Sequence, residues 1–372
     1  MRLGIDGKKM PEARKWGAVG VLERARELGM GGVFFRTVLD MSPDLDLGYL
    51  REVRARADAL GMYLETGVGK VNPYALPETP EVREVGNGDV LHGFRRMMEA
   101  CAAIECRELW VAMANYKTAF VGKYSTDRFR TDVAWHEQLE ATERLLKKLA
   151  PMARDLGVHL NIETHEEATT FEIVRLVEAV GPDAIGIVFD SANVLQRTEH
   201  PVFAARRVAP YVRQTHVKDA LIASGPEGIR YQTRPCGGGS VDFAEILQLL
   251  AAYNPDLNLS IENDMSHDDR PRTPVKMRID IHDSEWNAAH PDLTAEEFDA
   301  FMALVADGDR RVATGEVPDF EAFAERRPGY AETIEDILVT AAHIRRICKD
   351  FDLPLADAPG AACELTMASH DR

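Results

Sequence analysis

The sequence predicts an α/β protein: a closed (β/α)8 barrel followed by a C-terminal helical extension. One local phrase, a helix that ends in glycine before an apolar run, occurs at residues 26–30, 58–62 and 154–158. Glycine at that point permits the left-handed conformation in which helices commonly end. Because the helix–glycine–strand unit recurs about every 30 residues, strands and helices should alternate, which is typical of a parallel sheet.

Eight segments have the pattern of buried strands, and amphipathic helices separate them. The predicted strands cover residues 3–7, 32–37, 63–68, 109–113, 159–163, 185–190, 214–216 and 258–262. The predicted helices lie near 16–28, 47–60, 91–104, 135–156, 170–180, 201–209 and 242–252. Eight strands that end at Glu262 fit a closed barrel, which typically needs about 250 residues. An open doubly wound sheet is the alternative, but no G-x-G-x-x-G motif follows the first strand.

The chain changes character near its last predicted strand, so we divide it into a barrel over 1–263 and an extension over 264–372. Residues 264–292 are polar and should form a long loop beside the active face. A capping-box pattern at 294–297 then opens a helix. A later apolar stripe at helical spacing should pack on the barrel or on a partner. The tail after Pro354 has little periodicity and should be extended or loosely attached.

Composition excludes two classes of partner. The formal net charge of −17 argues against nucleic acid, because proteins that bind it usually need a basic surface to displace counterions. No segment approaches the roughly 18–20 apolar residues of a membrane span. The five cysteines show neither zinc spacing nor a disulfide framework, which suits a reducing compartment. We therefore expect an acidic, globular, cytoplasmic protein without a nucleic-acid or membrane partner.

Strands five to eight each end in a side chain that binds metals: Glu163, Asp190, His216 and Glu262. Any one of them alone would more often be a helix cap or an ion-pair partner. In a closed barrel, however, the C-terminal ends of the strands converge on the mouth, where barrel active sites lie. Three carboxylates and one imidazole make a mostly oxygen site, which suits Mn²⁺ or Mg²⁺ better than zinc. The sequence therefore predicts a divalent-metal site.

The motifs around these residues resemble those of the xylose-isomerase-like TIM barrels, a group of sugar isomerases, epimerases and relatives. The resemblance covers roughly residues 1–263 and rests on N-I-E-T-H, V-F-D-S-A-N, T-H-V-K-D and S-I-E-N-D, with G-G-G-S-V-D-F at 237–243. It implies that one divalent metal, most often Mn²⁺ with Mg²⁺ or Co²⁺ as alternatives, is held by Glu163, Asp190, His216 and Glu262.

Such a site supports chemistry beside a carbonyl group. A metal that chelates a carbonyl oxygen and a neighbouring hydroxyl stabilises an enediolate, so a proton on the adjacent carbon becomes removable. In the ketose epimerases of the family two glutamates move this proton, and the resemblance assigns the work to Glu163 and Glu262. Reprotonation of the enediolate gives isomerisation or epimerisation, whereas loss of a β-substituent gives elimination.

Two residues favour elimination. Asn193 stands where the ketose epimerases usually have a histidine. His165 shares the strand face of Glu163, where it either orients a carboxylate or acts as a general acid/base. Glu-x-His with a long region after the last barrel strand resembles the α subunits of bacterial C-glycoside deglycosidases, which act on 3-oxo-glycosides with a smaller β subunit. We expect a metal-dependent lyase of this kind; the alternatives are a free-ketose isomerase or epimerase and an inosose-type dehydratase.

Three residues are candidates for substrate binding. Lys218 should point into the cavity, where it holds a substrate oxygen or pairs with Asp190 or Asp264. Asn193 follows the predicted metal ligand on strand six. Arg234 precedes the glycine-rich stretch and is placed either to reach a substrate or to be solvated.

The expected small-molecule partner is a keto-sugar or keto-glycoside. The resemblance also implies an oligomer, with a small second subunit as one form of it. A metal-dependent abasic-site endonuclease shares the barrel, but it needs further His and Asp ligands and a basic groove. A barrel that keeps its fold as an inert scaffold is the non-enzymatic alternative.

Overall fold

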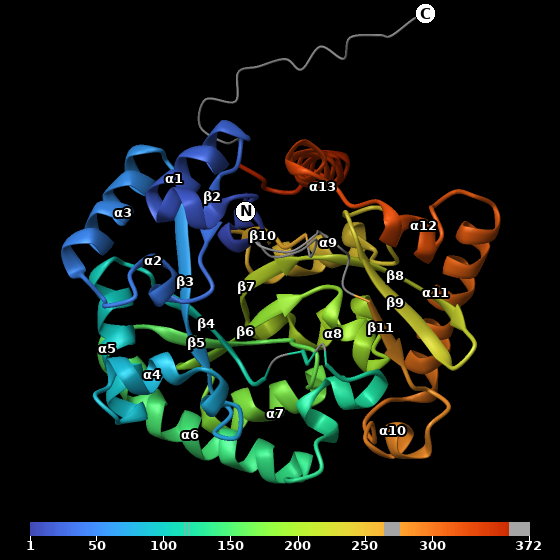
Figure 1. Cartoon of the computed structure of the whole chain (residues 1–372), viewed down its shortest axis with the longest axis horizontal. Helices are drawn as coiled ribbons and strands as arrows, with labels where there is room; N and C mark the ends of the chain where they lie inside the picture. The colour runs from blue at the N-terminus through green and yellow to red at the C-terminus, as the bar shows by residue number, and fades with distance from the viewer. Residues whose placement is uncertain (115, 118, 264–275, 357–372) are drawn as a thin grey trace, which may run out of the picture.

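The computed structural model describes residues 1–114, 116–117, 119–263 and 276–356. Its centre is a closed barrel of parallel strands in the order β1-β10-β7-β6-β5-β4-β3-β2 (Figure 1). The strands are β1 (Arg2–Asp6), β2 (Gly32–Phe34), β3 (Tyr63–Lys70), β4 (Glu108–Ala112), β5 (His159–Glu163), β6 (Ile185–Asp190), β7 (Val212–Val217) and β10 (Asn258–Ile261). The predicted (β/α)8 barrel is confirmed, and each barrel strand overlaps its predicted segment.

Helices surround the barrel on its outside (Figure 1). Those that the sequence predicts are α1 (Ala13–Glu27), α3 (Leu47–Ala59), α5 (Val90–Ala103), α6 (Trp135–Leu156), α7 (Thr170–Val180), α8 (Pro201–Val208) and α9 (Phe243–Tyr253). Shorter elements were not expected: α2 (Val38–Met41), α4 (Pro80–Val85), η1 (Gly7–Lys9), η2 (Leu76–Glu78), η3 (Gly122–Ser125), η4 (Asp127–Phe129), η5 (Asn193–Arg197) and η6 (Ala209–Tyr211).

Helix α6 illustrates how the sequence builds this outer layer. Leu145, Leu146 and Leu149 lie three and four residues apart and are all buried, so they form one apolar face toward the sheet. The helix ends at Gly157, whose φ of 63° is the left-handed conformation that glycine adopts without steric cost. Strand β5 follows at once. The repeated helix–glycine–strand phrase therefore marks a βα unit of the barrel.

A second sheet interrupts the barrel between β7 and α9. It is three-stranded and antiparallel, and consists of β8 (Asp219–Gly225), β9 (Gly228–Arg234) and β11 (Lys276–Ile279), in the order β11-β9-β8. The prediction of a structureless loop over 264–292 is wrong for its described part, which holds β11 and α10 (Ser284–Ala288). Strand β11 exists because β9 offers it a free edge, and that edge comes from a distant part of the sequence. Residues 264–275 lie outside the described part of the chain.

The C-terminal helices are α11 (Ala295–Ala313), α12 (Phe320–Glu325) and α13 (Tyr330–Asp350). The predicted cap of α11 is present, because the Thr294 side chain accepts from the backbone N–H of Glu297. The apolar stripe of α13 is buried at Ile337, Ala341 and Ile344, each 0 % exposed. Figure 1 shows α11 and α12 beside the second sheet, and α13 packs against α9 and β10. Among the described residues no helix is both long and apolar enough to cross a membrane.

Candidate metal centre

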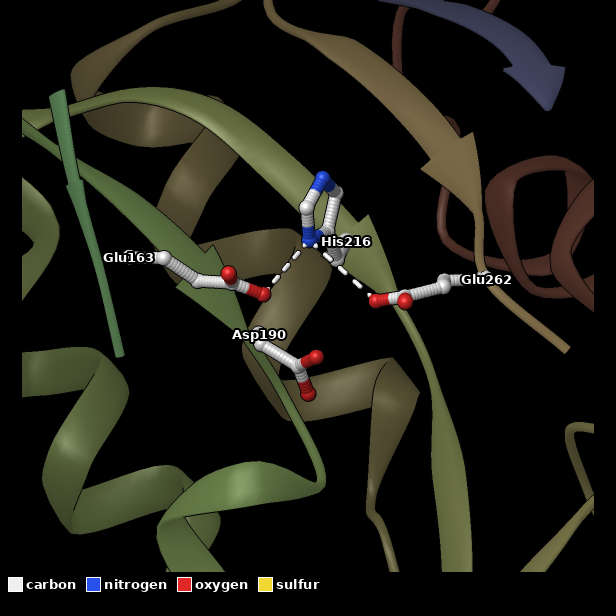
Figure 2. Close-up of side chains that lie close together, drawn as sticks. All are labelled: Glu163, Asp190, His216 and Glu262. Atoms are coloured by element: carbon white, nitrogen blue, oxygen red, sulfur yellow. Dashed lines mark hydrogen bonds and ion pairs between the residues drawn. The ribbon is translucent and has the colours of Figure 1, made fainter. Parts of the chain in front are cut away.

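Glu163, Asp190, His216 and Glu262 converge at the C-terminal ends of the barrel strands (Figure 2). Each of the four offers one ligand atom, and these atoms all lie within 4.8 Å of one another. All four side chains are buried, the most exposed of them at only 2 %. The structure therefore brings together the four residues that the sequence singles out, from β5, β6, β7 and the end of β10.

The imidazole of His216 lies between the two glutamates. Its Nδ1 is 2.8 Å from Oε1 of Glu163 and 3.2 Å from Oε2 of Glu262, while Nε2 points away from them (Figure 2). The ring of Phe34 packs on the imidazole with centroids 4.8 Å apart. Nε2 has no hydrogen-bond partner among the described residues. Nδ1 is thus the nitrogen directed at the carboxylates.

Trp110 fixes the second oxygen of Glu163. Its indole N–H donates to Oε2 of Glu163 at 2.8 Å. Trp110 lies on β4, next to β5, and packs with Phe34 and Val188 in a buried apolar cluster. Packing was the role expected of this tryptophan, and the sequence carries no signal for its hydrogen bond. It is a residue of the site that sequence reasoning did not find.

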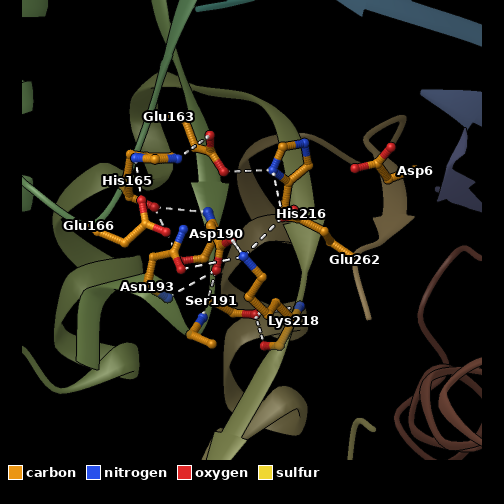
Figure 3. A network of polar contacts seen from close by, with 12 residues as sticks. Asp6, Glu163, His165, Glu166, Asp190, Ser191, Asn193, His216, Lys218 and Glu262 are labelled. Atoms are coloured by element: carbon orange, nitrogen blue, oxygen red, sulfur yellow. Dashed lines mark hydrogen bonds and ion pairs between the residues drawn. The ribbon is translucent and has the colours of Figure 1, made fainter. Parts of the chain in front are cut away.

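Asp190 is held from two directions. Its Oδ1 accepts the backbone N–H groups of Ala192 and Asn193, each at 3.0 Å, so it caps the turn that leads into η5. Its Oδ2 lies 2.9 Å from Nζ of Lys218, which also lies 3.1 Å from Oε2 of Glu262. Lys218 therefore points inward as expected, and pairs with two of the four carboxylate and imidazole residues (Figure 3).

Two further cations meet the outer oxygen of Glu262. Arg36 Nη2 lies 2.9 Å and Lys9 Nζ 3.3 Å from Oε1 of Glu262. Arg36 also lies 3.6 Å from Oδ2 of the buried Asp6. None of these three was singled out from the sequence. Asp6 ends β1 and Arg36 follows β2, so the strand-end position that identified the other residues would have found these two, whereas Lys9 lies in η1.

The four residues fit a divalent cation. Burial disfavours the charge of His216, yet the carboxylates of Glu163 and Glu262 outweigh it and raise its pKa. Burial likewise raises the pKa of Asp190, against the charge of Lys218. Three buried carboxylates this close repel one another unless positive charge lies among them. Lys218, Lys9 and Arg36 supply part of that charge, and the donor set of one imidazole Nδ1 and three carboxylates would suit Mn²⁺ or Mg²⁺ as a further cation.

His165 borders the same centre. Its Nδ1 contacts the carboxylate of Glu166 and lies 2.9 Å from Oε2 of Glu167, and its Nε2 is 3.9 Å from Oε2 of Glu163 (Figure 3). Burial lowers the pKa of this imidazole, but the neighbouring carboxylates raise it well above the ordinary value. Glu167 is fixed in turn by the backbone N–H of Ala114 at 2.9 Å. One edge of the ring is therefore anchored and the other faces the metal centre.

The structure brings Asn193 to the centre but directs Arg234 elsewhere. Oδ1 of Asn193 lies 3.4 Å from Nζ of Lys218. Arg234 is also buried, but its guanidinium donates to the backbone carbonyl of Pro318 at 3.1 Å and lies 3.9 Å from the centre of the Phe323 ring. Both partners belong to the C-terminal extension. Of the two alternatives for Arg234, solvation does not hold because the extension covers the side chain, and contact with a substrate stays a prediction.

The chain is similar to known proteins in sequence and in fold. The family model described as xylose isomerase-like TIM barrel matches residues 22–281. Among solved structures, D-psicose 3-epimerase from Clostridium cellulolyticum H10 is similar, with a TM-score of 0.60 at 13 % identity over 93 % of this chain and 99 % of that one. A 3-keto-D-glucoside 4-epimerase from E. coli gives a TM-score of 0.52 at 15 % identity over 82 % and 99 % of the two chains. At these identities the likeness shows the fold.

Curated relatives match over shorter stretches. An uncharacterized Escherichia coli protein, YihM, is 34 % identical over 28 % of this chain and 32 % of its own length. A 3-oxo-isoapionate decarboxylase from Pectobacterium atrosepticum is 26 % identical over 32 % and 44 %. An inosose dehydratase from Bacillus cereus is 24 % identical over 24 % and 30 %. The matched stretches thus cover 30–44 % of the length of these relatives.

Proposed function

The chain belongs to the xylose isomerase-like TIM-barrel family, and we propose that it is a divalent-metal-dependent enzyme that removes a proton beside the carbonyl of an oxidised sugar. The observation that carries the proposal is the convergence of Glu163, Asp190, His216 and Glu262 within 4.8 Å. Mn²⁺ is the metal we propose, with Mg²⁺ or Co²⁺ as alternatives.

Each residue has a role in this reaction. Glu163, Asp190, His216 and Glu262 hold the metal, and the two glutamates also move the proton. When bound, the cation supplies positive charge to a substrate oxygen that becomes negative as the proton leaves. Lys218 lies among these carboxylates and donates hydrogen bonds to substrate oxygens. Asn193, 3.4 Å from Lys218, extends the same polar surface.

We propose elimination as the outcome, on a 3-oxo-glycoside. A glutamate takes the proton from C2, the electron pair of that bond forms the C1–C2 double bond, and the bond from C1 to the aglycone breaks. The leaving group needs a proton, and His165 is positioned to give it. Its Nδ1 is anchored by Glu167 at 2.9 Å, so the opposite edge of the ring faces the centre. The products are an unsaturated keto-sugar and the protonated aglycone, so no further reactant is required.

Reprotonation of the same carbanion would instead give an epimerase or isomerase of a free ketose. Loss of a ring hydroxyl would give an inosose-type dehydratase. The Bacillus cereus relative favours this last alternative, because it carries that activity in its name, but it aligns with only 24 % of this chain. His165 favours elimination over simple epimerisation, since expulsion of a leaving group needs an acid beside the base.

We further propose that the protein acts in the cytoplasm as an oligomer or with a small second subunit. The helical extension over 264–372, taken as a unit separate from the barrel over 1–263, would provide the surface for such a partner. Both statements rest on the sequence. Size measurement of the purified protein, alone and mixed with candidate subunits, tests the proposed assembly.

The first test is metal content by elemental analysis before and after chelation and refilling. About one ion per chain, lost in Glu262→Ala, is expected. Aryl 3-oxo-glucosides and free ketoses are then incubated in deuterium oxide. Release of the aryl alcohol, with no deuterium entering free ketoses, supports elimination. Deuterium exchange into free ketoses without any product from the oxidised glycosides would contradict it.

Variants separate the roles of the residues. Glu163→Gln should abolish turnover on every substrate while the fold remains. His165→Gln should slow release of poor leaving groups far more than that of good ones, because only poor leaving groups need the acid. His282→Gln is the matched control, because His282 is an exposed histidine of the C-terminal extension. Equal slowing for good and poor leaving groups would remove His165 as the acid.

A further inference from the structure

A hollow lies between the end of β9, α12 and α13, which Figure 1 shows near one another. Its lining includes none of the four metal-centre residues. Its volume is about 580 Å³, within the range of small-molecule sites in proteins. Its apolar wall includes Val317, Phe323 and Val339. Val339 is 49 % exposed, so apolar surface on α13 is open here. The hollow is large enough for a small metabolite, and its exposed apolar wall could contact an apolar part of that molecule.

Arg234 lines this hollow without an ion-pair partner among the described residues. Its side chain is almost wholly buried at 3 % exposure, yet among the described residues no carboxylate forms an ion pair with it. Its Nη2 donates to the backbone carbonyls of Pro318 at 3.1 Å and of Asp319 at 3.5 Å, and its Nε has no hydrogen-bond partner among the described residues. Burial lowers the pKa of Arg234 to about 10, so the group is still charged at neutral pH. A buried charge of this kind is costly until an anion pairs with it.

The charges of Asp319 and Asp219 raise the pKa of Arg234 against its burial, but their carboxylates accept hydrogen bonds from backbone groups. The carboxylate of Asp319 accepts the backbone N–H of Ala322 at 2.7 Å and caps α12. Asp219 accepts the backbone N–H groups of Gly237 and Gly239, each at 2.9 Å. These hydrogen bonds hold both carboxylates in place, and none of the described residues that line the hollow is acidic.

Two further donors line the hollow on α13. The guanidinium of Arg346 donates to Nδ1 of His343 at 2.9 Å. The imidazole then carries its proton on Nε2 and can donate it to a ligand. Gly237 brings the opposite wall close, because a Cβ there would lie 2.7 Å from Nδ1 of His343. Among the described residues, two guanidinium groups and an imidazole line the hollow and no carboxylate does, although the chain has a net charge of −17.

We propose that this hollow binds a small organic anion: a carboxylate or phosphate attached to an apolar body. The anionic group pairs with Arg234 and Arg346, and the apolar body lies against Val317, Phe323 and Val339. Guanidinium groups suit both anions, because their planar donors match carboxylate and phosphate oxygens. None of the residues that line the hollow is one of the four metal-centre residues, so the proposal assigns Arg234 to a ligand other than the reacting substrate.

Titration calorimetry on the metal-free full chain tests this, with phenyl phosphate and benzoate as probes. Benzyl alcohol and inorganic phosphate separate the contributions of the apolar body and the charge. The metal-free protein avoids binding of the probes to a metal ion. We expect one phenyl phosphate or benzoate per chain, and markedly weaker binding of the two partial probes. Whichever of phenyl phosphate and benzoate binds with the higher affinity identifies the preferred anionic group.

Variants then locate the binding. Arg234→Gln and Arg346→Gln should each weaken it by about ten-fold or more, the loss expected for a charged hydrogen bond. Val339→Trp should block the site without removing charge. Arg144→Gln removes an exposed arginine of α6 that does not line the hollow, and it should leave the affinity for the probes unchanged. If Arg234→Gln does not fold, the exposed positions Arg346 and Val339 decide. Absence of binding at millimolar probe, or equal binding by Arg346→Gln and Val339→Trp, overturns the proposal.

Discussion

Trp110 and Glu163 come from neighbouring strands, and the indole N–H of Trp110 donates to Oε2 of Glu163 across 2.8 Å. The other oxygen of the same carboxylate faces His216 at 2.8 Å. A residue that was expected only to pack thus fixes the direction in which a predicted metal ligand points. Partners of this kind orient ligands and tune the affinity of a metal site.

Trp110→Phe keeps most of the apolar contact but removes the donor. We expect the affinity for Mn²⁺ to fall by about 10- to 100-fold, the usual effect of losing such a partner. Titration of the metal-free variant with Mn²⁺ measures this. Trp16→Phe is the matched control, because Trp16 packs against Tyr330 on the outside of the barrel. Unchanged affinity in Trp110→Phe would mean that the hydrogen bond does not orient Glu163.

Metal binding should also appear as thermal stability. A ligand that binds only the folded state at 100 times its Kd adds about 2.7 kcal/mol to the free energy of unfolding. Chelation should therefore lower Tm and added Mn²⁺ should restore it. Asp190→Asn should lose this gain, whereas Asp155→Asn, at an exposed position on α6, should keep it. A full Mn²⁺-dependent gain in Asp190→Asn would exclude Asp190 as a ligand.

Glu65 makes the stability of the barrel depend on pH. Burial on β3 raises its pKa from 4.5 to about 7, although Asn258 donates to its Oε1 at 2.7 Å. Between these two pKa values the folded chain keeps a proton that the unfolded chain has released. The free energy of unfolding therefore falls as pH rises through this window, by a total on the order of 3 kcal/mol.

Glu65→Gln removes this dependence while it keeps an oxygen for Asn258. We expect the variant to be more stable than the natural chain at pH 8, with a much smaller difference at pH 5. Urea unfolding at the two pH values measures it. Glu140→Gln, where the carboxylate lies 64 % exposed beside Arg144, is the control and should show no such difference. A constant difference across this range would contradict the assignment to Glu65.

Gly308 lets α11 approach the second sheet closely. A Cβ at this position would lie 1.9 Å from the backbone oxygen of Ile222 on β8. Gly308→Ala should therefore destabilise the protein by about 1–3 kcal/mol, as overpacking of a dense contact does. Ala306→Ser adds one atom on the exposed side of the same helix and should be nearly neutral. Urea unfolding compares them, and equal stability would show that α11 moves away from β8 without cost.

The order of strands and helices and the four metal-centre residues could be predicted from the sequence, because both depend on local patterns. A strand repeats every two residues and a helix every 3.6, so apolar positions report each element. Strand-end polar residues then follow from the rule that parallel strands in a barrel present their C-terminal ends at one mouth. Glu163, Asp190, His216 and Glu262 needed no tertiary information beyond that rule.

Only the tertiary structure decided which distant groups meet. Strand β11 forms on the edge of β9, Lys9 and Arg36 reach Glu262 from the first two strands, and Arg234 turns toward Phe323 on the extension. These contacts join residues far apart in the chain, and no local periodicity records them. They are set by how side chains fill the space between packed elements, which depends on the whole fold at once.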